Sequence, residues 1–572
     1  MSRKLLFGAE ADKIQDTLFR VARQRQVVGG SRLLVEFGEQ ARALARAYGA
    51  APQDVLVASG GSFRIQFSED KRQDIEEFGN RLADAYRLLM DASITLAELQ
   101  TFDADFKSAN EEVGRSIRRR KQAERGAGDN PHSPAVAYCQ SSGVGLAVTH
   151  GFDYRVRDMS QANTQEKRYL SQFAQSMAWA GIDVKEDESR DSFLGRVRQH
   201  LPASHRKWDW ADDVDRIAQY DGQRSNIAYL IADVNNMGEL FGECETPEEL
   251  KLLSDHLDDT MYRITAHIIP ALTAKLPGGN GPPTLPVLPL ILAGDDAFVV
   301  LPALYAIDAA QQFCLEFEEV MQQSEVVQRL IQKGCPPPTI AAAVVICKGH
   351  FPYYLAHQRG ELLLEEVKRL IKTVGARGEG WRSALAFDFI IGSELVSDRR
   401  ERLDGVKPSL SVYWATSRLE LLDDAEQPMR VQSALSAFAL SAALPVQAVL
   451  DQRKAPKDLP NKRLAELREL FDPESLPSDA AEMPTHWNPR LEKLRARLKA
   501  TDRVRDNKHL AWLDEALKAL GDSSDASKPG HWKPVRRGGR SYLAHGLPDL
   551  IEAWNYTQAL DHNLSEYTGE AR

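Results

Sequence analysis

Hydrophobic positions along the first 100 residues follow two spacings. Short apolar runs bounded by turn residues are typical of strands, and apolar residues three or four apart are typical of helices. Two of the apolar runs flank a Gly-Gly pair, which predicts a tight hairpin. The predicted elements are a strand at 5–7, helices at 12–26 and 31–48, a hairpin at 55–67, a helix at 70–92 and a strand at 94–102.

The same order of elements returns, at greater length, in the second half of the chain. It comprises a strand at 227–232, a helix at 247–275, a hairpin at 290–301, a helix at 304–323, a strand at 339–347, a helix at 361–374 and a strand at 383–391. Self-similarity of this kind predicts an internal duplication. The first hairpin turn reads Gly-Gly-Ser at 60–62 and the second Gly-Asp-Asp at 294–296, so only the second carries acids that can hold a metal.

The segments outside the two repeats are more polar. Residues 104–222 mix helical patterns with short apolar runs and include a basic run at 118–121, which fits either a solvated helix face or a surface that contacts nucleic-acid phosphate. The chain after residue 392 is rich in helical patterns. We therefore expect an α+β protein with domains over 1–103, 104–222, 223–392 and 393–572.

Composition narrows the class of protein. Of the 572 residues, 43% are hydrophobic and 27% charged, which is ordinary for a globular chain and excludes collagen and global disorder. A net charge of −10 excludes a polycation that coats nucleic acid over its whole surface. The five cysteines form no CxxC pair, and no apolar run reaches about 18 residues. These features predict a cytoplasmic protein without a signal peptide or membrane span.

Two acidic segments carry the candidate chemistry. Asp233 directly follows the predicted strand 227–232, and Asp295 and Asp296 lie in the turn of the second hairpin. If the strands are neighbours, the three carboxylates meet at one sheet edge, where their repulsion favours a hard cation such as Mg²⁺. Two such ions would activate an attacking hydroxyl and stabilise a leaving pyrophosphate. Taken singly, each segment is equally typical of a surface turn or a helix cap.

Several motifs, in this order, resemble one family. The chain is similar to the large polymerase/cyclase subunit of type III CRISPR effector complexes, whose two palm domains are related to GGDEF diguanylate cyclases and class III nucleotidyl cyclases. The residues that carry the resemblance are Ala-Asp-Lys-Ile-Gln-Asp at 11–16, Val-Gly-Gly-Ser at 28–31, Ser-Gly-Gly-Ser-Phe at 59–63, Asp-Val-Asn-Asn-Met-Gly at 233–238, Ala-Gly-Asp-Asp at 293–296, Lys368, and Ser-Ala-Leu-Ala-Phe at 383–387.

The resemblance implies a fold and an activity. The fold is α+β with two ferredoxin-like palm domains, a non-catalytic one at 1–103 and a catalytic one at 223–392, joined by a helical and small β domain and followed by a helical domain. The implied activity joins ATP molecules into cyclic oligoadenylate messengers in antiviral defence. The implied partners are CRISPR effector subunits, guide RNA and the target RNA that triggers synthesis, with no membrane partner.

The resemblance also assigns roles to particular residues. It implies that Asp233, Asp295 and Asp296 are catalytic and bind Mg²⁺ or Mn²⁺. Lys368 is implied to contact the triphosphate of ATP, and Ser383 its base. The full set of residues implied to bind ATP is Asn235, Asn236, Gly238, Gly294, Lys368 and Ser383.

The sequence departs from the family pattern in places. Ala293 replaces the first glycine of the GGDD turn, and Asn235 stands where many relatives carry Asp. Ser142 replaces the second cysteine of a CxxCG zinc ribbon, so we expect no structural zinc. No histidine precedes an aspartate, so we expect no HD nuclease. Two alternatives therefore stay open: a catalytically inactive scaffold subunit of an RNA-binding complex, and a stand-alone cyclic dinucleotide synthase.

Overall fold

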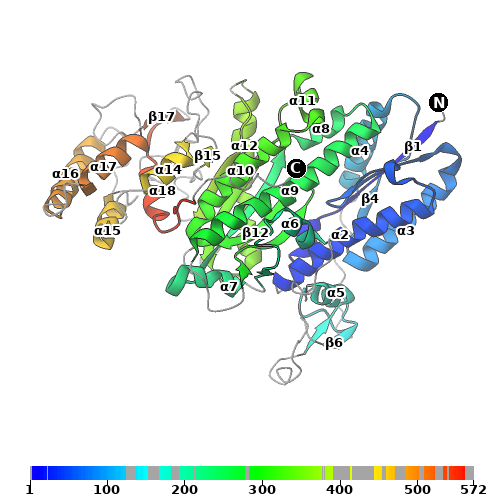
Figure 1. The fold of residues 1–572 in the computed structure, drawn as a ribbon, viewed down its shortest axis with the longest axis horizontal. Helices are drawn as coiled ribbons and strands as arrows, with labels where there is room; N and C mark the ends of the chain where they lie inside the picture. The colour runs from blue at the N-terminus through cyan, green and yellow to red at the C-terminus, as the bar shows by residue number, and fades with distance from the viewer. Residues whose placement is uncertain are drawn as a thin grey trace.

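The protein is elongated, with one sheet near the N-terminus, a larger sheet in the middle and a group of helices at the far end (Figure 1). The structure is a computed structural model. It describes residues 3–21, 24–123, 136–143, 145–151, 167–181, 192–211, 214–276, 283–376, 378, 380–390, 412–414, 444–453, 459–470, 483–501, 508–521, 533–537 and 540–560.

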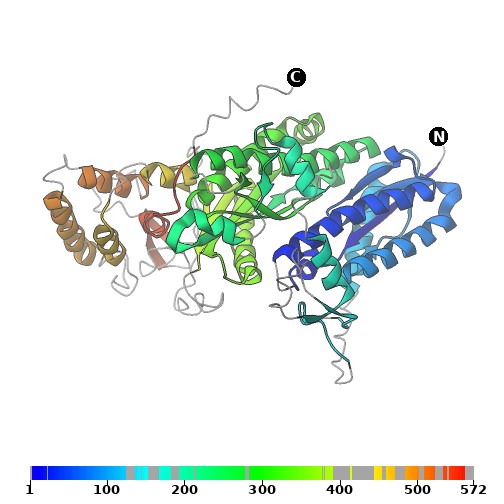
Figure 2. The same cartoon turned by 60° about the horizontal axis from the view of Figure 1, so that its bottom comes forward.

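The first sheet has the strand order of a ferredoxin-like domain. Its order is β2-β3-β1-β4 with antiparallel pairs, and β5 adds to β1. Two helices pack against each other through Phe37 and Tyr86 and lie across one face of the sheet (Figure 2). The elements are β1 (Lys4–Ala11), α1 (Ile14–Leu18), α2 (Gln24–Ala47), β2 (Val55–Ser59), β3 (Ser62–Ser68), α3 (Arg72–Met90), β4 (Ile94–Leu96) and β5 (Gln100–Phe102).

The second sheet repeats this order and extends it. Its order is β11-β12-β9-β13-β14-β15-β16, so the first four strands correspond to β2, β3, β1 and β4. The elements are β9 (Asn226–Asn235), α8 (Met237–Glu243), α9 (Pro247–Lys275), β11 (Leu288–Ala293), β12 (Asp296–Pro302), α10 (Ala306–Gln322), α11 (Glu325–Gln332), β13 (Thr339–Lys348), α12 (Tyr353–Ala376), β14 (Ala384–Phe389), β15 (Val412–Trp414) and β16 (Leu444–Pro445). The predicted α+β fold with two ferredoxin-like palms is confirmed, and the two sheets with their helices are called the first and second palm below.

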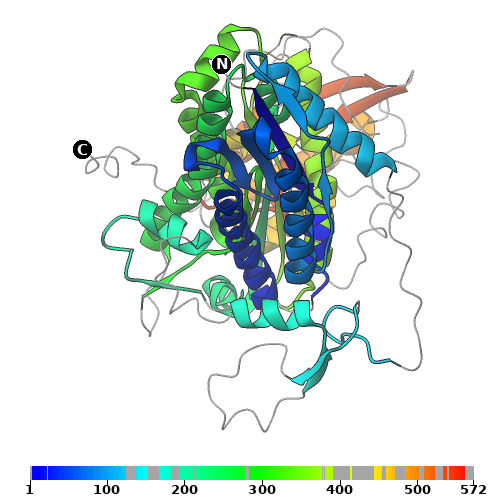
Figure 3. The ribbon, with the colours of Figure 1, turned by 90° about the vertical axis from the view of Figure 1, so that its right-hand side faces the viewer.

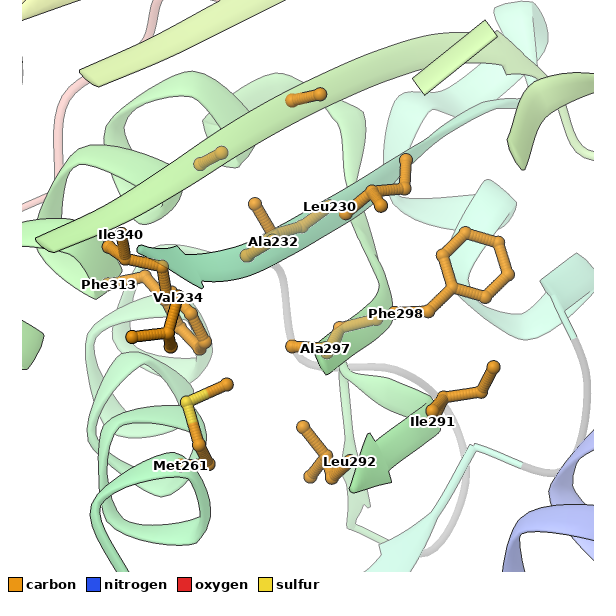
Figure 4. Close-up of a cluster of buried hydrophobic side chains, with 14 of the residues drawn as sticks. Leu230, Ala232, Val234, Met261, Ile291, Leu292, Ala297, Phe298, Phe313 and Ile340 are labelled. Atoms are coloured by element: carbon orange, nitrogen blue, oxygen red, sulfur yellow. The ribbon is translucent and has the colours of Figure 1, made fainter. Parts of the chain in front are cut away.

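Successive side chains of β9 point to opposite faces of the second sheet. Val234 faces α9 and α10, where it meets Met261, Phe313 and Ile340 in a buried cluster (Figure 4). Ile231 points the other way, toward Gly360 of α12. Because successive side chains alternate across a strand, Asp233 shares the α12 face with Ile231.

The remaining described elements surround the palms. A pair of short strands projects from the body of the molecule (Figure 3), and the neighbouring α5 packs on α2 of the first palm. Within the described residues no helix is both long and apolar enough to cross a membrane. These elements are α4 (Phe106–Ala123), β6 (Thr149–Gly151), β7 (Arg168–Leu170), α5 (Gln172–Ala180), α6 (Phe193–His200), β8 (Asp209–Trp210), α7 (Val214–Ala218), β10 (Thr284–Leu285), α14 (Val446–Arg453), α15 (Asn461–Leu470), α16 (Met483–Thr501), α17 (Lys508–Ala519), β17 (Lys533–Arg537), β18 (Arg540–Ala544) and α18 (Leu547–Glu552).

Several predicted elements need correction. The expected helix over 12–26 is wrong as a single element, because α1 ends at Leu18 and α2 starts a separate helix. Residues 94–102 form two short strands, both paired with β1. Helices α8 and α11 were not predicted, and α12 begins at Tyr353 rather than at 361, directly after Pro352. The predicted domain boundaries stay predictions.

Strand register aligns the two repeats residue by residue. Glu10 of β1 lies opposite Ser62 of β3, and Asp233 of β9 lies opposite Asp296 of β12. Three residues after each of those acids, Lys13 and Asn236 adopt left-handed backbone (φ 49° and 69°) and start a short helix. Glu10 and Ser62 therefore hold the positions of Asp233 and Asp296 in the first repeat.

The two palms pack against each other reciprocally. Helix α9 of the second palm lies on β2 of the first, and α2 of the first palm lies on β11 of the second. The two hairpin turns touch: a Cβ added to Gly60 would lie 3.1 Å from the backbone N and Cα of Gly294. Beside this contact, Phe19 of α1 packs on Phe298 and His357 of the second palm. This packing places the acidic turn against the first palm.

Candidate active site

Three carboxylates meet where β9 ends and β12 begins. Asp233 and Asp296 are directly opposed on neighbouring antiparallel strands, so their side chains share the face covered by α12. Asp295 lies in the turn, and its carbonyl oxygen accepts a hydrogen bond from the Val234 amide at 3.1 Å. The convergence predicted from the sequence is therefore present in the structure.

Turn geometry shows why Ala293 is tolerated in this hairpin. The residue with left-handed backbone is Gly294, at φ 63°. Ala293 is not among the residues with positive φ, so its methyl group costs no backbone strain. The replacement of the first glycine of the motif does not disturb the turn.

Burial and mutual repulsion leave the carboxylates with unfavourable electrostatics. Burial, followed by the nearby charge of Asp233, raises the pKa of Asp295 to about 6. Burial and then the charges of Asp295 and Asp233 raise the pKa of Asp296 well above its ordinary value. Carboxylates held together this way are stabilised by a cation between them, which is typical of metal-dependent phosphoryl-transfer sites.

Two side chains partly offset this repulsion. Lys368 of α12 places its Nζ 2.7 Å from Oδ2 of Asp233. Gln15 of α1 donates from Nε2 to Oδ2 of Asp296 at 3.1 Å, across the contact between the palms. The predicted triphosphate lysine is thus at the site, and a residue of the first palm touches a catalytic candidate.

The carboxylates of this site suit a divalent metal that takes few protein ligands. Among the residues that the structure describes, no group of three or more His, Cys, Asp or Glu side chains is arranged to hold a metal ion. The opposed pair Asp233 and Asp296 nevertheless fits the usual binding of Mg²⁺, which takes one or two carboxylates and completes its shell with phosphate oxygens and water. Asp295 is close enough to raise the pKa of Asp296, and its role as a metal ligand stays a prediction.

Of the other residues predicted to bind nucleotide, some line the cavity beside the carboxylates and others are buried in the fold. Gly238 and Gly294 line the cavity beside the carboxylates. Asn235 is buried with Nδ2 3.5 Å from Thr339 Oγ1, and Asn236 donates to the Pro337 carbonyl at 2.9 Å. The role of both asparagines in ATP binding stays a prediction.

Ser383 is fully buried at the start of β14. Its hydroxyl oxygen accepts a hydrogen bond from the Ile340 amide at 3.0 Å, and its own amide donates to Glu318. Ser383 is not among the residues that line the cavity. Its described contacts are structural, and its assigned contact with a base stays a prediction.

A cavity of about 850 Å³ opens between the palms on one side of the carboxylates. Asp295 and Asp296 line it, whereas Asp233 does not. A face of α8 and α9 contributes mainly apolar side chains, and the first palm with α4 contributes cations together with the acids Glu10, Asp16 and Glu111. The α8 and α9 face consists of Met237, Phe241, Leu250, Ser254, Leu257 and Asp258. The cations are Lys13, Arg64, Arg115, Arg118 and Lys121. An apolar face opposite cations suits a ligand with a flat base and phosphates.

The basic run at 118–121 divides between two faces of α4. Arg118 and Lys121 line the cavity. Arg119 lies 2.9 Å from Glu112 and Arg120 lies 3.8 Å from Glu98 on the exposed side of the helix. Half of the run therefore points to the cavity, and the other half is a solvated, ion-paired face.

Sequence reasoning missed the residues that the first palm supplies. Lys121 lies 2.6 Å from Glu10 and 3.4 Å from Asp12, so it neutralises the first repeat's strand end as Lys368 does in the second. Gln15 lies in the quoted segment 11–16, but that motif does not predict its contact with Asp296, and Arg64 lies in no quoted motif. The signal that was available is the repeat itself, because aligning Glu10 with Asp233 places the first palm's strand end at the same junction.

Residues 226–373 match the family model described as Cas10/Cmr2, second palm domain. The second palm is Cas10-like. The predicted resemblance to palm-domain subunits of type III CRISPR complexes is confirmed by this match, which includes Asp233, Asp296 and Lys368. No curated protein matches the chain.

Solved structures give weaker likenesses. A Csm1–Csm4 cassette in complex with cA4 matches at 14% identity over 68% of this chain and 54% of that chain, with a TM-score of 0.41. The cassette in complex with pppApApA matches at 15% identity over 90% and 69%, with a TM-score of 0.47. Csm1 in T.onnurineus matches at 14% identity over 64% and 52%, with a TM-score of 0.39. The chain spans about half the length of the first of these structures.

Proposed function

We propose that the protein is a nucleotidyltransferase that joins ATP into cyclic oligoadenylates, as a subunit of a type III CRISPR effector complex. The observation that carries the proposal is the pair Asp233 and Asp296, opposed across two neighbouring strands. Burial and repulsion raise the pKa of Asp296, Lys368 pairs with Asp233, and Asp296 borders a cavity lined by both cations and acids. A purely structural role would not require buried carboxylates that repel each other.

The proposed reaction forms one bond and breaks one bond. The 3′-hydroxyl oxygen of one nucleotide attacks the α-phosphorus of ATP, the bond to the β-phosphate oxygen breaks, pyrophosphate leaves, and the hydroxyl proton passes to solvent. Bound Mg²⁺ or Mn²⁺ would neutralise charge on the reacting phosphate and lower the pKa of the attacking hydroxyl. Asp233 and Asp296 would hold that ion, and Asp295 would support them.

The chain's cations take the phosphate charge. Lys368 is ion-paired with Asp233, and an incoming triphosphate would offer it an alternative anion. Arg64 and Arg118 line the cavity between the palms, whereas Lys368 does not. We propose that these residues bind the phosphates of the second nucleotide or of the growing product, which holds its 3′-hydroxyl near the carboxylates.

The proposed partners follow from the family match rather than from a described surface. Effector-complex subunits, a guide RNA and a target RNA would control when the site works. The cavity-facing half of the α4 basic run is assigned to nucleotide phosphate, which leaves Arg119 and Arg120 as the exposed basic positions.

The test is product formation from labelled ATP or GTP with Mg²⁺, in the presence and absence of guide and target RNA. The wild type is expected to convert ATP into cyclic oligoadenylate and pyrophosphate, and Asp296→Asn to lose at least a hundredfold in rate. Asp255→Asn on α9, whose carboxylate pairs with Lys251 3.1 Å away, is the matched control and is expected to retain activity. Unchanged turnover in Asp296→Asn would overturn the assignment of the site. Conversion of GTP without RNA would favour the stand-alone synthase.

A further inference from the structure

Asp258 is a carboxylate of the cavity wall that the proposed reaction does not use. It lies on α9, one turn after Ser254 and beside Leu257, and all three side chains line the cavity. Leu250 and Leu257 are almost completely buried, so Asp258 is the acidic group at the edge of an otherwise apolar helix face. A carboxylate in that position has lost much of its water and needs hydrogen-bond donors.

The protein supplies only part of what this carboxylate needs. The Ser59 side chain hydrogen-bonds to it. The guanidinium groups whose charge acts on it, Arg42 and Arg196, instead pair with Glu39 at 3.7 Å and 3.2 Å. Within the described part of the chain, no Lys, Arg or His nitrogen forms an ion pair with Asp258. One side of the carboxylate is therefore left to face the cavity.

The internal duplication provides a comparison for this position. The repeats align with a constant offset from Glu10 and Asp233 through Lys13 and Asn236 to the starts of α2 and α9. The same offset pairs Ser31 with Ser254 and Val35 with Asp258. In the first repeat the helix is closed against its neighbour, because Ser31 donates to the Leu290 carbonyl at 2.5 Å. The acid is present only in the repeat whose helix faces the open cavity.

We propose that Asp258 determines base specificity by accepting a hydrogen bond from the 6-amino group of adenine. The inference rests on the proposed function, since it assumes that the cavity holds a nucleotide. The partly buried ring of Phe241, packed beside the almost buried Met237, Leu250 and Leu257, would contact the ring of the base, and Asp258 lines the same cavity.

The chemistry of the two polar groups on this face explains the choice. An ionised carboxylate only accepts hydrogen bonds, so it favours the amino group of adenine and disfavours the 6-oxygen of guanine. The Ser254 hydroxyl both donates and accepts, so it binds either edge and discriminates little. Burial raises the pKa of Asp258 to about 6, against the opposing effects of Ser59 and Arg196, which leaves the group mainly ionised at pH 7.5. Placing the ionised Asp258 opposite the 6-oxygen of guanine would bring two hydrogen-bond acceptors together, which costs free energy and so selects adenine.

The experiment removes the amino group from the ligand and the carboxylate from the protein. Equilibrium binding of a non-hydrolysable ATP analogue and of the matching analogue without the 6-amino group is measured with Mg²⁺ at pH 7.5. The proteins are the full-length wild type, Asp258→Val, Asp258→Asn and a control, Glu248→Gln, at an exposed position of the same helix. Asp258→Val inserts the residue of the first repeat. Circular dichroism confirms that each variant is folded.

We expect the effect of removing the 6-amino group from the ligand to depend on whether the Asp258 carboxylate is present. Wild type and Glu248→Gln should bind the amino analogue about tenfold or more tightly than the deamino analogue, as a hydrogen bond to a charged group predicts. Asp258→Val should bind both equally, and Asp258→Asn, which keeps a carbonyl acceptor, should retain part of the preference. A wild type that binds both analogues equally, or an Asp258→Val protein with undiminished preference, overturns the inference. Because these are binding measurements, they fail separately from the turnover test of Asp296.

Discussion

The residues of the site gain their properties from partners that are distant in sequence. Lys368 reaches Asp233 from α12 because β9 alternates, and Gln15 reaches Asp296 from the other repeat. Each acid therefore has one neutralising or donating neighbour, which is less than a buried carboxylate needs. The remaining deficit is what we assign to a divalent ion and the phosphates of a nucleotide.

Removing Lys368 tests its role in phosphate binding. We expect Lys368→Ala to weaken binding of a non-hydrolysable ATP analogue about tenfold or more, as expected for loss of a charge-assisted contact. Lys372→Ala, one turn further along the same helix at an exposed position, is the matched control and should bind like the wild type. Equal binding by Lys368→Ala and wild type would show that the lysine only pairs with Asp233.

The titration of Asp258 predicts how nucleotide binding depends on pH. Its pKa lies near 6, so lowering the pH from 7.5 to 5.5 protonates the carboxyl and removes the charged acceptor. The charges that act on it are Arg196 and Arg42, which favour the ionised form, and Asp255, which opposes it. Preference for the amino analogue over the deamino analogue should fall over this range in the wild type. It should stay flat in Asp258→Asn.

At the scale of elements, the hairpin turns join the two repeats. Gly60 and Gly294 both have positive φ, and each lies against the other's backbone. A glycine in this position serves two purposes, since it adopts the turn conformation and permits close backbone approach. The position of the acidic turn therefore depends on the turn of the first repeat.

Substituting Gly60 tests this dependence. A Cβ at Gly60 meets backbone atoms of Gly294 and Ala293, so Gly60→Val should lower the free energy of unfolding and abolish nucleotidyl transfer. Gly143→Val is the control, because Gly143 also has positive φ but has open space around it. It should lose about 1–2 kcal/mol through backbone strain and keep its activity. Equal losses in both variants would indicate that the turns do not depend on each other.

The elements show how far the sequence carries the prediction. Periodicity located β9, α9, both hairpins and α10, because long apolar patterns record local structure directly. Periodicity predicted one helix where the structure has α1 and the start of α2, because helical spacing continues through the break after Leu18. Motifs pointed to Asp233, Asp295, Asp296 and Lys368, but no motif predicted the contact of Gln15 with Asp296 or pointed to Asp258. Their roles arise from packing between the repeats, which no local pattern records.

At the scale of the whole molecule, the site lies at a junction of two related halves. The buried ring of His357 is part of that junction and packs on Phe19 of the first palm and Phe298 of the second. Burial lowers the pKa of His357 to about 4, so the ring is neutral at pH 7 and its 3.5 Å contact with Glu361 is not an ion pair there. The packing at this junction therefore favours the neutral form of the His357 imidazole.

This neutral histidine makes the junction sensitive to acid. The unfolded chain binds a proton at His357 near pH 6.5, whereas the folded protein does so only near pH 4. Stability is therefore fully present above pH 6.5 and falls as the pH drops toward 4, by up to about 3 kcal/mol from this group. Urea unfolding at several pH values should show a shallower loss in His357→Gln than in the wild type. Parallel curves for the two proteins would contradict the assignment.

The most direct test of the central claim is Mn²⁺ binding measured by electron paramagnetic resonance in the presence of a non-hydrolysable ATP analogue. The account predicts tight binding by the wild type and by Asp255→Asn, and at least tenfold weaker binding when either carboxylate of the opposed pair is removed by Asp233→Asn or Asp296→Asn. Undiminished Mn²⁺ affinity in both of those variants would contradict it, because the two strands would then not share an ion.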